Sequence, residues 1–142
     1  MTQEDKDLLY TDLCARLPYG VKFACNKNVY TAKGLDLIVT DEGDWEYAVT
    51  AKGIAPIEID FIKPYLLPLS SMTEEQQEEF DRIYADDMQV VANNLKNKLD
   101  GKPYETNLGH YRHIDWLNAN HFDYRGLIEK GLALDATGLN IY

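Results

Sequence analysis

The chain has 142 residues, of which 24 are acidic and 14 are basic, so its formal net charge at neutral pH is −10. This charge repels the phosphates of nucleic acids and of anionic membranes, which argues against both as partners. A chain of this length corresponds to one ordinary domain, and it buries enough surface to fold without a metal or a disulfide.

The first ten residues contain no long apolar run and no small-residue cleavage site, and no later segment reaches about 18 consecutive apolar residues. We therefore expect a cytoplasmic protein with no membrane partner. The two cysteines, Cys14 and Cys25, lie on a helical and a strand pattern, which favours two reduced core thiols. A disulfide stays open as the alternative in an oxidising compartment.

The chain is predicted to begin with an amphipathic helix. Thr2 and Asp5 have the spacing of a helix cap, and apolar residues then recur every three or four positions until Pro18 and Gly20 stop the pattern. The helix has only about 15 residues, so packing against the rest of the protein must stabilise it.

Between residues 21 and 62 the apolar period changes to two, which is typical of strands. Five short strands are predicted, at 21–25, 29–31, 35–40, 45–50 and 57–62. The turn signal at 41–44 joins the third and fourth into a hairpin, and Ile57, Ile59 and Phe61 are predicted to share one face of the fifth. We expect a curled five-stranded antiparallel sheet or a small SH3-like barrel.

Residues 63–68, with the sequence KPYLLP, are predicted to connect the sheet to a helical half. Pro64 and Pro68 lack the backbone N–H that a central strand donates, so the sheet should end there. The residues between the prolines are expected to form a packed, extended connector in which Tyr65 and one or both of Leu66 and Leu67 are buried.

The helical half is predicted to start at Thr73, whose hydroxyl and the amide of Gln76 have capping-box spacing. Apolar residues follow at helical spacing as far as residue 99, which predicts one long helix. Two collinear helices are the alternative, because Asp86 and Asp87 offer a second cap. A loop at 101–110 then leads to a short helix that Asn120 is predicted to end in the left-handed conformation.

Asp123 is predicted to cap a further helical turn at 124–130, and 132–142 to form an edge strand or an ordered tail. The sequence thus predicts one α+β domain over 1–142 that is β-rich at 1–68 and helical at 69–142.

The start of the long helix is strongly acidic, with a single arginine, Arg82, among its carboxylates. These are Glu74, Glu75, Glu78, Glu79, Asp81, Asp86 and Asp87. They predict a face that binds a basic partner protein, and the alternative is a solvated surface that maintains solubility. We therefore expect a non-catalytic accessory or interaction protein.

A second class of function is a metal or small-molecule site near the C-terminus. Its candidate ligands are His110, His113, Asp115, His121 and Asp123. The alternative is that these side chains lie on the surface or cap helices. Asp123 and Arg125 also have the spacing of a phosphate or carboxylate site, against the alternative of a helix cap and an ion pair.

No phosphate-binding glycine loop, CxxC, HExxH or GxSxG motif occurs in the chain. The sequence therefore predicts neither an enzyme nor a cofactor.

Two stretches carry a resemblance to known proteins: KPYLLPLSSMTEE at 63–75 and IDWLNANHFDYRGLIEKGLAL at 114–134. They resemble signature stretches of a group of small uncharacterised proteins of gut bacteria and their phages or mobile elements, and LCARLPYGVK at 13–22 is similar too. The resemblance covers about a third of the chain. It implies a prokaryotic or phage setting and an accessory role, and it assigns no catalytic residue.

Overall fold

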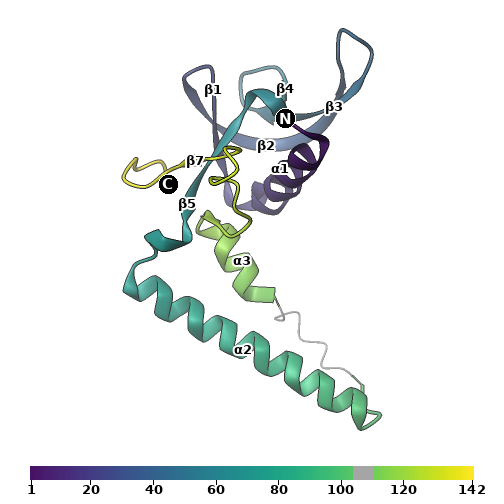
Figure 1. Cartoon of the computed structure of the whole chain (residues 1–142), viewed down its shortest axis with the longest axis vertical. Helices are drawn as coiled ribbons and strands as arrows, with labels where there is room; N and C mark the ends of the chain where they lie inside the picture. Colours follow the sequence, from purple (N-terminus) through teal and green to yellow (C-terminus); the bar gives the residue numbers. More distant parts are fainter. Residues whose placement is uncertain (104–110) are drawn as a thin grey trace. The chain divides into compact units, whose positions relative to one another are not determined.

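The computed structural model describes residues 1–103 and 111–142. It contains helices and a mixed sheet, so the prediction of an α+β protein with an N-terminal helix is confirmed. The chain forms two compact units (Figure 1). The sheet unit comprises 1–69 and 121–142, and the helical unit comprises 70–120. A single domain over 1–142 stays a prediction.

Helix α1, Gln3–Arg16, begins at the predicted cap. The Thr2 hydroxyl accepts from the N–H of Asp5 at 3.1 Å, and the Asp5 carboxylate accepts from the N–H of Thr2 at 3.4 Å. A 3-10 turn at Leu17–Tyr19 follows and ends at Gly20, whose φ of 69° is one that glycine adopts readily.

The sheet unit contains an open sheet with strand order β4-β3-β2-β1-β5-β6, and β7 pairs with β5. Its strands are β1 Lys22–Cys25, β2 Asn28–Val39, β3 Trp45–Ala51, β4 Ile57–Glu58, β5 Lys63–Pro68, β6 Phe122–Asp123 and β7 Leu134–Asp135. Neighbours among β1–β5 are antiparallel, whereas β6 and β7 run parallel to β5. The predicted five-stranded antiparallel sheet and the SH3-like barrel are therefore wrong, because the sheet is larger, mixed and not closed.

Strand β2 is one continuous strand where the sequence predicted two. Its pairing with β3 shifts between Ala32 and Gly34, so a bulge bends the strand and lets it continue past the break in the pattern. A Cβ at Gly34 would lie 2.9 Å from the Thr50 hydroxyl oxygen, which explains why glycine occupies the bend. Beyond it the predicted hairpin is confirmed, with Val39 opposite Trp45.

The proline-containing segment 63–68 is strand β5, not a connector outside the sheet. Its bonds to the C-terminal segment use the N–H of Leu67, which donates to the carbonyl of His121 at 2.9 Å, and the carbonyl of Leu66, which accepts from Ala136 at 2.8 Å. Because these groups belong to the leucines, the missing N–H of each proline removes neither bond. The prediction that one or both leucines are buried is confirmed by Leu66, which is fully buried, whereas Leu67 is half-buried. Tyr65 was also predicted to be buried, but it is only half-buried.

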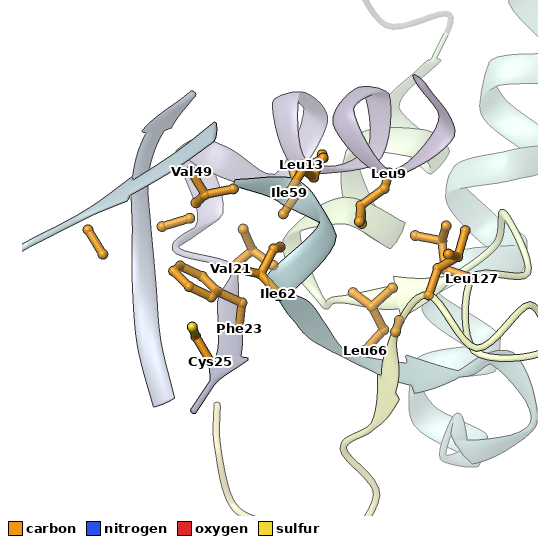
Figure 2. Packing of buried hydrophobic residues seen from close by; sticks show 14 residues of the cluster. Leu9, Leu13, Val21, Phe23, Cys25, Val49, Ile59, Ile62, Leu66 and Leu127 are labelled. Atoms are coloured by element: carbon orange, nitrogen blue, oxygen red, sulfur yellow. The ribbon is translucent and has the colours of Figure 1, made fainter. Parts of the chain in front are cut away.

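The core of the sheet unit lies between α1 and the curled sheet (Figure 2). Its fully buried residues from α1, β1, β3, β5 and the segments beside them are Leu9, Leu13, Val21, Phe23, Val49, Ile59, Ile62, Leu66 and Leu127. Leu127 comes from the C-terminal segment, so the core joins the two ends of the chain.

The helical unit contains α2, Glu74–Leu99, and α3, Arg112–Ala119. Helix α2 is a single helix of 26 residues, so Asp86 and Asp87 do not interrupt it. The predicted capping box is present: the Thr73 hydroxyl accepts from Gln76 N–H at 3.1 Å, and the Gln76 amide oxygen accepts from Thr73 N–H at 3.0 Å. Phe80 packs against Trp116 of α3 at 5.7 Å between ring centroids.

The predicted helical turn at 124–130 is wrong. The backbone forms turns there, and Gly126 has a φ of 73°, which an α-helix does not allow. The left-handed conformation expected at Asn120 is taken instead by His121, with a φ of 60°. Residues 121–142 belong to the sheet unit. Of the predicted edge strand at 132–142, only the two residues of β7 form a strand.

Within the described ranges, no helix has both the length and the apolar character needed to cross a membrane.

Candidate functional site

One concave surface of the sheet unit is a mostly apolar groove of about 620 Å³. It is lined by the β1–β2 turn, by β2, by the loop before β4 and by the 3-10 turn after β4. The lining residues are Cys25, Asn26, Tyr30, Ile38, Ile54, Ala55, Pro56, Ile57, Glu58 and Phe61. Its volume falls within the range of ligand-binding pockets.

The conformation of the chain after β4 explains why Phe61 reaches this groove. Residues Ile59–Phe61 form a 3-10 turn, and Ile59 and Ile62 on either side of its exposed part are buried in the core. The turn therefore directs Phe61 outward, and it is 66% exposed. The expectation that Ile57, Ile59 and Phe61 share one face of a strand is wrong, because β4 ends at Glu58.

A second depression of about 350 Å³ adjoins the groove, since Glu58 lines both. It is lined by Thr40 and by six carboxylates: Asp41, Glu42, Asp44, Glu46, Glu58 and Asp60. We call it the acidic depression. The tight turn at 40–44 and the turn after β4 bring these side chains together, although the two segments are well separated in the sequence.

Lys6 of α1 neutralises part of the acidic depression. Its ammonium group lies 2.9 Å from Glu46 and 3.0 Å from Asp60, and the hydrogen bonds to these carboxylates raise the pKa of Lys6. In the part of the chain that the structure describes, Lys6 is the cation that pairs with this cluster. Four carboxylates are left to attract a basic group.

The acidic residues predicted on α2 have two different roles. Glu74, Glu75, Glu78, Glu79 and Asp81 are exposed, so they are available to a basic partner. Asp86 is exposed too, but its carboxylate lies 3.5 Å from the Arg112 guanidinium of α3. Asp87 is buried, which removes it from the predicted protein-binding face. Its Oδ2 accepts from the backbone N–H of His113 at 2.9 Å, and its Oδ1 accepts from Arg112 at 3.3 Å.

The ring Nδ1 of His113 also lies 2.6 Å from Asp87 Oδ2. Burial raises the pKa of Asp87, but the hydrogen bonds from His113 and Arg112 outweigh burial and hold the pKa below its ordinary value. This carboxylate therefore joins α2 to α3 within the helical unit.

The described residues that were predicted as metal ligands do not come together, and His110 lies outside the described residues. His113 pairs with Asp87, and Asp115 is exposed on α3. Asp123 accepts from the N–H groups of Leu127 and Ile128, at 2.9 and 2.8 Å, so it caps a turn where the alternative interpretation had it cap a helix. Among the described residues, no three His, Cys, Asp or Glu side chains are grouped to hold a metal.

His121 is buried against the C-terminal residue. Its ring stacks on Tyr142 with centroids 3.6 Å apart, and its Nδ1 has no hydrogen-bond partner within 1–103 and 111–142. Burial lowers the pKa of His121 to about 4, and the positive charges of Arg16 and Lys22 act in the same direction. His121 is therefore neutral at pH 7.

The interpretation of Arg125 as half of an ion pair is the one the contacts support. Its guanidinium donates to Asp12 of α1 at 2.9 Å, and the same carboxylate accepts from Arg16 at 2.8 Å. The side chains of Asp12 and Arg16 are fully buried. This charge cluster holds the C-terminal segment on α1, and no local pattern indicated it because its members lie up to 113 positions apart.

The groove and the acidic depression were missed because the strand pattern at 57–62 predicted an inward Phe61. The one signal in the sequence was the density of carboxylates at 41–46 and 58–60. Comparisons of the chain with protein-family models, curated proteins and solved structures give no match.

Proposed function

We propose that the protein is a non-catalytic interaction protein whose sheet unit binds a short, basic and apolar segment of a partner protein. The observation that carries this proposal is the apolar groove with exposed Phe61 at its edge, next to the acidic depression and joined to it by Glu58. An exposed apolar surface beside a charged one is typical of protein-binding sites.

The chemistry of the two surfaces defines the segment. An apolar side chain that enters the groove gains free energy by leaving water, and Phe61 offers its ring as an additional contact. A lysine or arginine a few residues away then reaches the four carboxylates that Lys6 does not neutralise. The exposed carboxylates of α2 are suited to the same class of basic partner and form a second surface in this proposal. An accessory role agrees with the resemblance to phage and mobile-element proteins.

The test uses the full-length chain and a random-peptide library displayed on phage. We expect selected peptides to carry a large apolar residue within a few positions of lysine or arginine. Fluorescence anisotropy with the synthetic peptides then measures affinity for the parent and for two variants. Phe61→Ala should weaken binding by about tenfold or more, since exposed aromatics dominate such interfaces. Glu58→Lys should weaken binding and reduce its dependence on salt.

Two matched controls change comparable side chains outside the groove. Trp45→Ala removes an aromatic side chain that is 69% exposed, and Glu129→Lys makes the same charge change at an exposed site. Both should bind the peptides as the parent does. Failure to select any peptide, selection of acidic peptides, or equal binding by Phe61→Ala and Glu58→Lys would refute the proposal.

A further inference from the structure

Helix α2 carries a narrow apolar stripe that is exposed. The stripe consists of Tyr84, Met88, Val91 and Leu95, which are 46%, 36%, 44% and 60% exposed. They follow each other at spacings of four, three and four residues, so they lie in one line over about three turns of the helix. Figure 1 shows α2 as the longest helix of the chain.

The stripe lies beside the part of α2 that α3 occupies. Phe80 and Asp87 contact α3 through Trp116 and His113, and Asp86 pairs with Arg112. Tyr84 touches the edge of the His113 ring, with centroids 5.2 Å apart, and still exposes nearly half of its surface. The packing of α3 therefore leaves the stripe available to another helix.

The charges at the two ends of the stripe indicate what covers it. Asp81 lies three residues before Tyr84, and Lys98 lies three residues after Leu95. The full series Asp81, Tyr84, Met88, Val91, Leu95, Lys98 has spacings of three, four, three, four and three. The series of spacings is the same in both directions along the helix, but the charges of the two end residues, Asp81 and Lys98, are opposite.

We propose that α2 pairs with α2 of a second copy of the chain, in antiparallel orientation, through this stripe. In the symmetric register Tyr84 faces Leu95 of the second copy and Met88 faces Val91. The next layer at each end places Asp81 opposite Lys98, so two ion pairs close the apolar contact. A parallel pair would instead place Asp81 beside Asp81 and Lys98 beside Lys98, which is repulsive.

The spacing and the flanking residues suit a close pair of helices. Alternation of three and four is the pattern of helices that cross at a shallow angle with side chains interlocked. Ala85 and Ala92, both exposed, follow Tyr84 and Val91 directly, and in this register they approach each other across the pair. Small residues at this flank let the two backbones approach closely. The pairing involves α2 alone, so it is independent of the groove proposed above.

Sedimentation equilibrium tests the pairing between roughly 1 and 500 µM protein, a range that covers dissociation constants typical of short contacts. The weight-average mass should rise with concentration from 16.3 kDa towards twice that value. Leu95→Glu should weaken association at least about tenfold, since it places a charge in the apolar layer. If circular dichroism shows that Leu95→Glu has lost helix, Val91→Gln serves as the second variant and should likewise weaken association. The control Gln89→Glu adds the same charge at an exposed position outside the stripe and should associate as the parent does.

Charge exchange tests the orientation. Lys98→Glu and Asp81→Lys should each weaken association, since each places like charges opposite one another at both ends. The double variant Asp81→Lys with Lys98→Glu should restore it, because every pair is again opposite in sign. A protein that stays monomeric over the whole range overturns the proposal, as does association that Leu95→Glu leaves unchanged. A double variant as weak as the single ones overturns the antiparallel orientation.

Discussion

Replacement of Asp12 by alanine tests how the C-terminal segment is held in the sheet unit. The Asp12 carboxylate accepts from Arg16 Nε at 2.8 Å and from Arg125 Nη1 at 2.9 Å. Arg16 Nη2 also donates to the carbonyl of Phe122 at 2.7 Å. Removal of the carboxylate leaves the Arg16 guanidinium buried with its charge uncompensated, at the junction of α1 and β6.

The expected loss is large because of this burial. Breaking a buried ion pair by removing one partner costs about 3 to 5 kcal/mol, since the remaining charge has lost both its partner and water. That is a substantial fraction of the total stability of a domain, about 5 to 15 kcal/mol. Arg125→Ala should cost only about 1 kcal/mol, because the Arg125 side chain is 21% exposed and its loss leaves Asp12 paired with Arg16.

Urea unfolding at pH 7, followed by circular dichroism, measures these free energies. Hydrogen exchange of the Ala32 amide, which donates to the carbonyl of Val21 at 2.9 Å, reports on the sheet unit separately. The double variant Asp12→Leu with Arg16→Met is the control. Apolar side chains of similar size can replace a buried ion pair at little cost, so it should recover most of the stability that Asp12→Ala loses. A cost below about 1 kcal/mol for Asp12→Ala would refute this reasoning.

Two further predictions concern the sheet unit. His121 has a pKa of about 4 in the folded protein and 6.5 as its ordinary value, so the unfolded chain binds the proton more strongly. The stability that this difference contributes is complete above pH 6.5 and decreases as the pH falls towards 4, by about 2 kcal/mol between pH 7.5 and pH 5. The variant His121→Asn is suitable because asparagine tolerates the positive φ at this position. Its stability, measured by urea unfolding, should not show this decrease. A pKa near 6.5 for the His121 ring of the folded parent, measured by NMR titration, would contradict the prediction. Leu66→Ala should cost about 2 to 5 kcal/mol because Leu66 is fully buried, and Leu67→Ala less because Leu67 is half-buried. If both variants unfold within about 0.5 kcal/mol of the parent, β5 is not a central part of the core.

The helix starts and the hairpin could be predicted from the sequence because their determinants are local. The capping boxes at Thr2 and Thr73 each involve residues three positions apart, and the turn at 41–44 sets the register of β2 and β3. The burial of at least one leucine between the two prolines was also predictable, since the prolines fix the direction of the chain there, and the structure shows that this leucine is Leu66.

The topology of the sheet and the candidate site depend on contacts between distant residues. Nothing near residues 121–142 indicates that they return to pair with β5, because the bonds to Leu66 and Leu67 and the ion pair of Arg125 with Asp12 exist only after the chain has folded. The outward direction of Phe61 has the same origin. Its neighbours alternate as in a strand, yet burial of Ile59 and Ile62 in one core requires a tight turn between them. A local period describes which residues are apolar, whereas the packing of the whole core determines which of them remain exposed.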